Sequence, residues 1–163
     1  MMTKDQFRNA LSGFPSGVTI VTTTDAERGW CGFTASSFCS VSAEPPLVLV
    51  CLADTAECHA AFLAARRWNI HIVDEAHTGL ATRFASRGAD KFAGNAFEAD
   101  AHGIPRLRNA FVTLQCRRHE IHASGDHAIL VGEVVDVDMT DSAPVFYYRR
   151  AFHPVEKAGE PTS

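Results

Sequence analysis

The sequence lacks the features that define several large classes of protein. It has no run of about 18 consecutive apolar residues, the length that a membrane-spanning helix requires, and no apolar signal segment near its N-terminus. Lysine and arginine total 15 against 19 aspartate and glutamate, which gives a formal net charge of −4. Nucleic-acid-binding proteins usually carry a basic excess, so we expect no nucleic-acid partner, no membrane partner and a cytoplasmic location.

The cysteines are irregularly spaced. The five cysteines are an odd number, and no C-x-x-C motif is present. Disulfide frameworks and zinc sites depend on regular sets of cysteines, so we expect reduced, mostly buried thiols and no metal. His119 and His122 do not change this expectation, because an odd spacing on a strand places two side chains on opposite faces. His71, flanked by apolar residues, is expected to be a buried histidine with its hydrogen bonds satisfied.

The common nucleotide-binding and hydrolase motifs are also missing. No G-x-G-x-x-G segment follows a strand, no Walker loop is present, and no G-x-S-x-G elbow occurs. These absences exclude a Rossmann fingerprint, a P-loop and a typical α/β-hydrolase nucleophile. If the protein binds a nucleotide, it does so through a different binding motif.

Length and patterning predict one domain that consists mainly of strands. Of the 163 residues 46% are hydrophobic, which suffices for one core. We expect this domain over residues 1–155 and a disordered polar tail over 156–163. Alternating or apolar runs predict strands at residues 18–24, 46–52, 68–74, 110–123, 127–139 and 145–152. Helices are expected after a Thr3–Gln6 capping box, at 55–66 and at 77–87, and a loop is expected at 89–106.

Hairpins dominate both ends of the chain. The sequence SGD at residues 124–126 is typical of a tight turn between two long strands. Strand–helix–strand alternation, which a doubly wound parallel sheet requires, is not the prevailing pattern. The sequence therefore predicts an antiparallel β-barrel decorated by helices.

A row of small and hydroxyl-bearing side chains precedes the most apolar strand. The segment GFTASSFCSVSAEPPLVLVCL runs from Gly32 to Leu52 and changes character at Pro45-Pro46. Small residues let a ligand approach the backbone, and hydroxyl and amide groups can hold an anion. The first half of this segment is therefore a candidate ligand site.

Two further segments carry side chains suited to ligand binding. His127 follows the SGD turn and begins a long strand, where it suits either a ligand at the barrel mouth or an ordinary surface position. Arg83, Arg87 and Lys91 lie around a glycine loop. Such cations suit a phosphate, and they equally suit a solvated helix C-terminus.

Taken together, these segments resemble the short-chain flavin reductases, the reductase components of two-component flavin-dependent monooxygenases. The resemblance rests on FRNALSGFPSGVTIVTT, GFTASSFCSVSAEPPLVLVCL, FASRGADKF, GDHAILVGEVVDV and VFYYRRAF, in this order from Phe7 to Phe152. It implies an FMN-binding split β-barrel of Greek-key type that is homodimeric. It also implies FMN or FAD at a barrel edge near the dimer interface, reduced by NADH or NADPH, with the diffusible flavin serving a separate oxygenase.

The resemblance also assigns residues to these ligands. The residues that match flavin contacts are Thr34, Ala35, Ser36, Ser37, Ser40, Ser42, Cys51, Leu52, Thr55, Ser86, Arg87, Lys91 and Phe92. His127, Tyr148 and Arg149 match the segments associated with the nicotinamide nucleotide. No catalytic side chain is expected, because hydride transfer takes place between the two cofactors and the protein supplies orientation.

One segment departs from the family pattern. Family members often carry serine and threonine after the central strand as phosphate ligands, whereas this chain has Ala56 and Cys58 and keeps Thr55. Phosphate binding is then expected to depend more on the arginines and on helix N-terminal amides.

Three functions remain open at this point. The first is an NAD(P)H:flavin oxidoreductase that supplies reduced FMN or FAD to a partner monooxygenase. The second is a split-barrel flavoprotein that keeps its FMN and acts on another small molecule. The third is a flavin-binding carrier without reductase activity.

Overall fold

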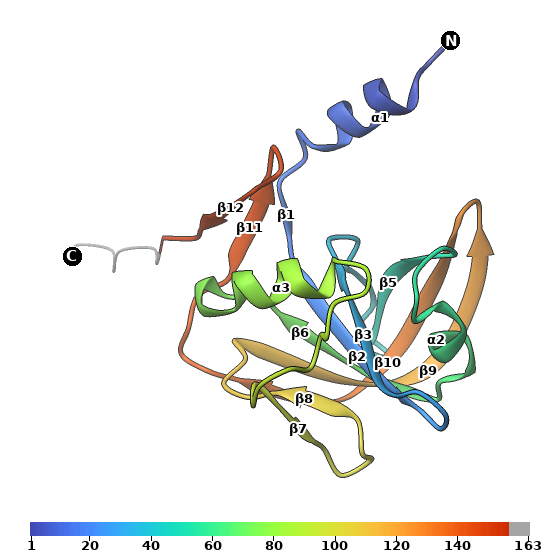
Figure 1. Ribbon diagram of the computed structural model, residues 1–163, viewed down its shortest axis with the longest axis vertical. Coiled ribbons are helices and arrows are strands. Elements are labelled where there is room, and N and C mark those ends of the chain that lie inside the picture. The colour runs from blue at the N-terminus through green and yellow to red at the C-terminus, as the bar shows by residue number, and fades with distance from the viewer. Residues whose placement is uncertain (157–163) are drawn as a thin grey trace.

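The computed structural model describes residues 1–156, and strands make up most of its regular structure (Figure 1). Within this range twelve strands occur: β1 (Ser16–Gly17), β2 (Thr19–Asp25), β3 (Gly29–Ala35), β4 (Cys39–Ser42), β5 (Leu47–Ala53), β6 (Arg67–Ile72), β7 (Phe97–Ala99), β8 (Pro105–Leu107), β9 (Val112–Ser124), β10 (His127–Met139), β11 (Val145–Tyr148) and β12 (Ala151–Pro154). The helices are α1 (Lys4–Leu11), α2 (His59–Ala64), α3 (Thr78–Phe84) and a short 3₁₀ turn, η1 (Glu75–His77).

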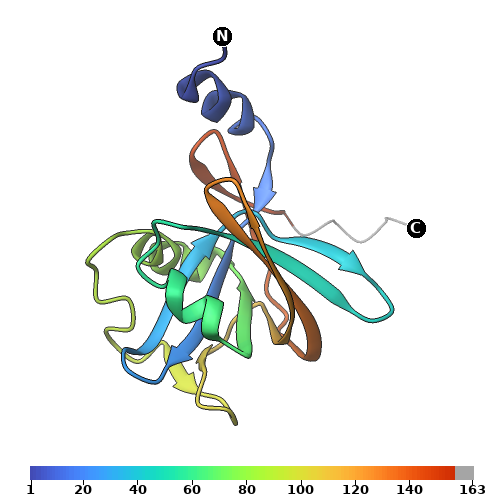
Figure 2. The same cartoon turned by 90° about the vertical axis from the view of Figure 1, so that its right-hand side faces the viewer.

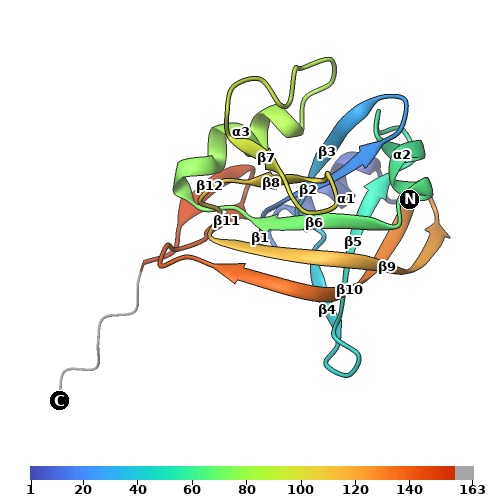
Figure 3. The same ribbon diagram turned by 90° about the horizontal axis from the view of Figure 1, so that it is seen from below.

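Seven of these strands form one curved, antiparallel sheet with the order β3-β2-β6-β9-β10-β5-β4. Strands β1, β11 and β12 form a separate three-stranded sheet, and β7 pairs with β8. The long central pair of the seven-stranded sheet, β9 and β10, is joined at the Ser124–His127 turn, where Gly125 has a φ of 60°. Figure 3 shows the sheet curling, with the end of the β4–β5 hairpin extending away from the body. The prediction of an antiparallel, hairpin-rich fold is confirmed.

Two clusters of buried side chains form the core. One contains Phe33 and the fully buried Trp68, and the other contains Phe84, which α3 contributes. A β-carbon at Gly132 would lie 3.1 Å from the Trp68 ring, so glycine is needed for close packing there. The two clusters meet near Phe33 and Phe84, and this junction forms one wall of the candidate site.

His71 on β6 lies fully buried between neighbouring segments. Its Nε2 accepts a hydrogen bond from the Leu107 backbone N–H at 3.1 Å, so Nδ1 carries the proton and donates to the Ile20 carbonyl at 2.9 Å. Burial lowers the pKa of His71 from 6.5 to about 4. The prediction of a satisfied buried histidine is confirmed.

The N-terminal helix α1 begins as the sequence predicts. The Thr3 side chain accepts from the Gln6 backbone, and the Gln6 side chain accepts from the Thr3 backbone, which completes a capping box. No residue of α1 is buried, and Phe7, Leu11 and Phe14 are exposed. Figures 1 and 2 show α1 standing away from the sheet.

Three local predictions are wrong in extent. The helix expected over 55–66 is shorter, because residues 54–58 form turns before α2 begins. The expected helix over 77–87 ends at Phe84. The loop expected over 89–106 contains β7 and the start of β8, which pair with each other. A strand of three residues is too short to show a recognisable alternation of apolar and polar side chains.

The strand expected over 145–152 is a hairpin. Strands β11 and β12 pair antiparallel, and Arg149 and Arg150 form the turn with φ values of 50° and 65°. Arginine is uncommon at positive φ, so the sequence carries no turn signal at this place. The tail expected over 156–163 lies outside the described residues, apart from Glu156. In the described part, no helix has the length and apolar character to cross a membrane.

Candidate functional site

A cavity of about 280 Å³, called here the main pocket, lies where β3, the end of β5, the segment after α3 and the start of β10 meet. Its walls combine small, apolar and charged side chains from six parts of the chain. The lining residues are Phe33, Thr34, Cys51, Leu52, Ala53, Thr55, Ala56, Glu57, Cys58, Phe84, Ala85, Ser86, Arg87, Lys91 and His127.

Strand β3 and helix α3 fit together closely at this pocket. The Thr34 hydroxyl donates to the Ala81 carbonyl at 2.5 Å and ties the strand to the helix. A β-carbon on Gly32 would lie 2.7 Å from the Val21 carbonyl and 2.8 Å from the Phe84 ring. Glycine at position 32 therefore lets Phe84 approach the strand and form the pocket wall.

The Ser37 side chain holds the strand that forms the opposite wall. Its hydroxyl accepts from the Cys51 N–H at 2.9 Å and donates to the Cys51 carbonyl at 3.4 Å. Ser37 does not itself line the main pocket. It fixes the backbone of Cys51, so the N–H of this predicted flavin contact is taken by the Ser37 hydroxyl.

Positive charge is concentrated at one end of the main pocket. The Arg87 guanidinium donates to the Thr55 carbonyl, and the Lys91 ammonium donates to the Gly32 carbonyl at 3.1 Å. Glu57 lies beside them, where its carboxylate accepts from the Gly88 N–H at 3.0 Å. Two cations against one carboxylate favour an anionic group, and arginine and lysine both bind phosphate.

The segment that departs from the family pattern lies in the same wall. Ala56 and Cys58 line the main pocket. Burial raises the pKa of the Cys58 thiol, which is therefore neutral near pH 7. A neutral thiol is a weak hydrogen-bond donor, so the side chains at this end that suit a phosphate are those of Thr55, Arg87 and Lys91.

His127 stands at the start of β10 and lines the main pocket. Its Nδ1 lies 2.6 Å from Oδ1 of Asp126, and both side chains are solvent-exposed. The His127 side chain lowers the pKa of Asp126 through their hydrogen bond. The aspartate remains ionised and fixes the orientation of the ring.

Several predicted flavin contacts do not line the main pocket. Ala35 is buried in the core. Ser36 lines a separate cavity with Tyr147 and Phe152. Ser40 and Ser42 belong to β4, in the β4–β5 hairpin.

The predicted nicotinamide residues are separated within one chain. Tyr148 and Arg149 lie at the tip of the β11–β12 hairpin, where the Arg149 N–H donates to the Ser12 carbonyl at 2.9 Å. The Arg149 guanidinium lies over the Tyr148 ring, 5.7 Å from its centroid. Figures 1 and 3 place this hairpin apart from the β9–β10 turn that carries His127.

Sequence reasoning missed two side chains that line the main pocket, Glu57 and Phe84. Helical spacing predicts that Phe84 is buried. It does not show whether the ring faces the core or lines a pocket. Glu57 stands between Ala56 and Cys58, in the segment already marked as a departure. Glu57 could have been identified from the sequence, because it places a carboxylate close to a predicted phosphate position.

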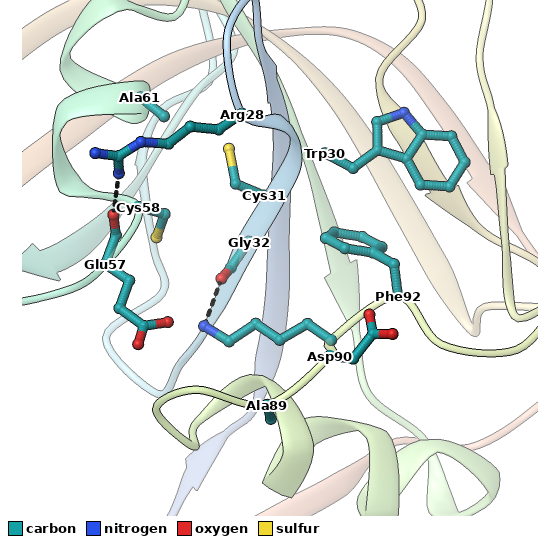
Figure 4. A pocket seen from close by; sticks show the side chains of 11 residues that line it. Arg28, Trp30, Cys31, Gly32, Glu57, Cys58, Ala61, Ala89, Asp90 and Phe92 are labelled. Carbon is teal, nitrogen blue, oxygen red and sulfur yellow. Dashed lines mark hydrogen bonds between the residues drawn. The ribbon is translucent and has the colours of Figure 1, made fainter.

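A second cavity of about 260 Å³, called here the Trp30 pocket, adjoins the main pocket and shares Glu57, Cys58 and Lys91 with it (Figure 4). It contains Phe92, which sequence reasoning placed with the flavin contacts. Within residues 1–156, no group of three His, Cys, Asp or Glu side chains has the arrangement that a metal ion requires.

Comparison with known proteins identifies the family. The model of the flavin reductase like domain matches residues 11–156, and the chain therefore belongs to the flavin reductase family. An NADH:riboflavin 5′-phosphate oxidoreductase of Streptomyces pristinaespiralis is 43% identical over 150 residues, 90% of this chain and 85% of that protein. The reductase component of a 4-nitrophenol 4-monooxygenase/4-nitrocatechol 2-monooxygenase of Rhodococcus opacus is 42% identical over 149 residues, 91% of this chain and 80% of that protein.

A solved structure agrees with this membership. The NADH:FAD oxidoreductase of Streptomyces globisporus C-1027, crystallised with NAD and FAD fragments, superposes with a TM-score of 0.87 at 28% identity. The match covers 98% of this chain and 95% of that one. The predicted flavin reductase fold is thus confirmed.

Proposed function

We propose that the chain is an NAD(P)H-dependent flavin reductase that reduces FMN or FAD and supplies the reduced flavin to a separate flavin-dependent monooxygenase. The observation that supports this most directly is the composition of the main pocket. Thr34, the backbone at Cys51, the Arg87–Lys91 cations and His127 come from distant parts of the sequence and line one cavity. This arrangement suits a flat polar ring with a phosphate at one end.

Each part of the main pocket has a separate task in this proposal. The wall at Cys51 and Leu52, fixed by the Ser37 hydroxyl, lies against the flavin ring, and the small side chains let the ring approach β3. Arg87 and Lys91 bind the phosphate. His127 would hold the nicotinamide nucleotide, and the two bound cofactors would supply the hydride-transfer chemistry while the protein orients them.

We further propose that the enzyme is a homodimer whose nicotinamide site is completed by a second copy. Tyr148 and Arg149 are distant from His127 within one chain, so they join it in one site only if the partner supplies them. The exposed Phe7, Leu11 and Phe14 of the α1 segment support an interface close to the same hairpin. Exposed apolar residues grouped on one segment are typical of protein–protein contacts.

The location that we propose is the cytoplasm, where reduced nicotinamide nucleotides are available. All five cysteines are unpaired thiols. Unpaired thiols are usual in a reducing compartment, which supports this location.

A steady-state assay of the purified protein tests the function. FMN, FAD and riboflavin are each combined with NADH or NADPH, and oxidation of the nucleotide is followed. A colourless preparation that oxidises NAD(P)H in proportion to added flavin is the expected result. A yellow preparation whose rate does not respond to added flavin would instead indicate a flavoprotein that retains its FMN. Flavin binding without nucleotide oxidation would indicate a carrier.

A further inference from the structure

A third cavity, called here the β8 pocket, lies between the β7–β8 pair and the neighbouring ends of β9 and β10. Its volume is about 350 Å³, and it shares no lining residue with the main pocket or the Trp30 pocket. Asp138, in its wall, lies near the end of β10, whereas His127 begins that strand. Figures 1 and 2 show β7 and β8 at the end of the molecule opposite α1. The β8 pocket is therefore separate from the flavin and nicotinamide sites proposed above.

Two arginines, each beside a carboxylate, line the β8 pocket. Arg106 Nη2 lies 2.6 Å from Oδ2 of Asp138, and Arg108 Nη1 lies 3.4 Å from Oε2 of Glu98. All four side chains are at least a third exposed, and ion pairs at such exposure contribute little to stability. A guanidinium carries five N–H donors and an ionised carboxylate about four acceptor sites. One ion pair therefore leaves most of these donors and acceptors available to a ligand.

Thr113 on β9 adds a buried hydroxyl without a partner. The residue is 2% exposed and lines the β8 pocket, and within residues 1–156 its hydroxyl forms no hydrogen bond. Thr113 pairs across the sheet with Asp138, so the two side chains lie on the same face. The other buried threonines, Thr19, Thr22 and Thr23, each donate to a backbone carbonyl. Because buried polar groups are normally hydrogen-bonded, the Thr113 hydroxyl points to a ligand in this cavity.

The charges in the β8 pocket balance, unlike those in the main pocket. Two guanidiniums stand beside two carboxylates here, whereas Arg87 and Lys91 of the main pocket face only Glu57. A simple anion would be repelled by both carboxylates of the β8 pocket, and a simple cation would be repelled by both guanidiniums. A small zwitterion meets an opposite charge at each of its ends, and arginine is well suited to a carboxylate.

We propose that the β8 pocket binds a free α-amino acid. The ligand carboxylate is held by Arg106 and Arg108, its ammonium group by the two carboxylates, and one further hydrogen bond joins it to the Thr113 hydroxyl. Asn109 also lines the cavity, and its carboxamide can both donate and accept, which favours a polar side chain on the ligand. This site goes beyond the proposed function, and its test depends on binding alone.

Thermal denaturation with each of the protein amino acids at about 10 mM is the first measurement, because a ligand that binds only the folded state raises Tm. Titration calorimetry then gives Kd for the amino acid with the largest effect. Its N-acetyl derivative lacks the positive charge, and its α-carboxamide lacks the negative charge. Each derivative loses a charge-assisted contact, so each should bind about tenfold to a hundredfold more weakly.

Thr113→Val and Arg108→Gln test the residues assigned to the site. Thr113→Val replaces an unpartnered hydroxyl by a methyl group, so the variant should keep or raise the Tm of the free protein and bind the amino acid about tenfold more weakly. Arg108→Gln removes one charge and should also raise Kd about tenfold. Arg117→Gln is the control, because Arg117 pairs with Glu133 at 2.8 Å between the same two strands, β9 and β10, and does not line the β8 pocket.

Selective binding of the zwitterion, weakened in Thr113→Val and Arg108→Gln and unchanged in Arg117→Gln, supports the proposal. The absence of a rise in Tm with every amino acid overturns it. An affinity for either derivative equal to that for the amino acid also overturns it, because the pocket would then recognise a single charge. Equal Kd values in the wild type and all three variants would place the bound amino acid outside the β8 pocket and likewise overturn the proposal.

Discussion

The Ser37 hydroxyl bonds to both backbone groups of Cys51, accepting from its N–H at 2.9 Å and donating to its carbonyl at 3.4 Å. This pair connects the row of hydroxyl residues to the apolar strand that follows it. A side chain that sequence reasoning assigned to the ligand therefore positions a wall of the pocket.

Replacing Ser37 by alanine should reduce the free energy of unfolding by about 1 kcal/mol, because the Cys51 N–H loses its partner. Chemical denaturation measures this change. The neighbouring Ser36→Ala is the matched control, since Ser36 is exposed and should change stability by less than about 0.5 kcal/mol. Equal effects of the two substitutions would contradict the role of the Ser37–Cys51 pair.

Arg87→Ala should weaken FMN binding about tenfold to a hundredfold, because a hydrogen bond between charged partners contributes about 1.5–3 kcal/mol. Riboflavin, which has no phosphate, should bind the variant and the wild type equally. Arg83→Ala is the control, because Arg83 lies on α3, donates to the Ala93 carbonyl and does not line the main pocket. If FMN and riboflavin lose affinity together, Arg87 does not act on the phosphate.

His127→Ala should raise KM for NAD(P)H with little change in flavin affinity. The lost hydrogen bond predicts a fall in kcat/KM of about tenfold to a hundredfold. His122→Ala is a matched control on the same hairpin, since the His122 ring is also exposed and pairs with a neighbouring carboxylate, that of Glu120, at 2.8 Å. Stopped-flow flavin reduction separates the two effects. An unchanged nucleotide affinity in His127→Ala would remove the binding role.

The proposed homodimer should be evident by light scattering at micromolar concentration. The double variant Phe7→Ser, Phe14→Ser should form a weaker dimer, which dissociates at a higher protein concentration than the wild type. The reason is that it removes two exposed apolar side chains in and just after α1. Leu63→Ser, which alters an exposed apolar residue on α2, should leave the association unchanged. A monomeric wild type would exclude a nicotinamide site completed by the partner.

His71 should make stability depend on pH in a defined window. Its folded pKa, about 4, lies below the unfolded value of 6.5, so the unfolded state binds the proton more readily. The contribution is fully present above pH 6.5 and is lost as the pH falls toward 4, to a limit of about 3 kcal/mol. Urea denaturation between pH 7 and 4 measures it. His71→Gln should lack this component, and an equal pH dependence in both proteins would contradict it.

Asp25 and Asp126 make the free energy of unfolding depend on pH in a lower pH range than His71 does. Their pKa values are lowered from 3.8, Asp25 mainly by the Arg28 backbone N–H and Asp126 mainly by the His127 side chain. Groups with depressed carboxyl pKa values lose their contribution below the unfolded value. The His71 effect can therefore be measured above pH 4 without them.

The sequence by itself determined the features that depend on near neighbours. The Thr3–Gln6 capping box needs residues three apart. The apolar strand at Leu47–Ala53 and the turn at Gly125 also follow from short patterns of residue type. These features form because propensity, periodicity and turn chemistry act over a few residues. The family resemblance added the Arg87, Lys91 and His127 assignments, which local patterns left open.

Only the tertiary structure decided which of these residues share a cavity. Ala35 and Thr34 are adjacent in sequence, yet the first is buried in the core and the second lines the main pocket, because successive side chains of a strand face opposite sides. Glu57 enters the site through packing of the α2 segment against the loop at Gly88. Such contacts join residues that are distant along the chain. They depend on how the sheet curves and on which faces bury apolar surface, and no local pattern specifies either.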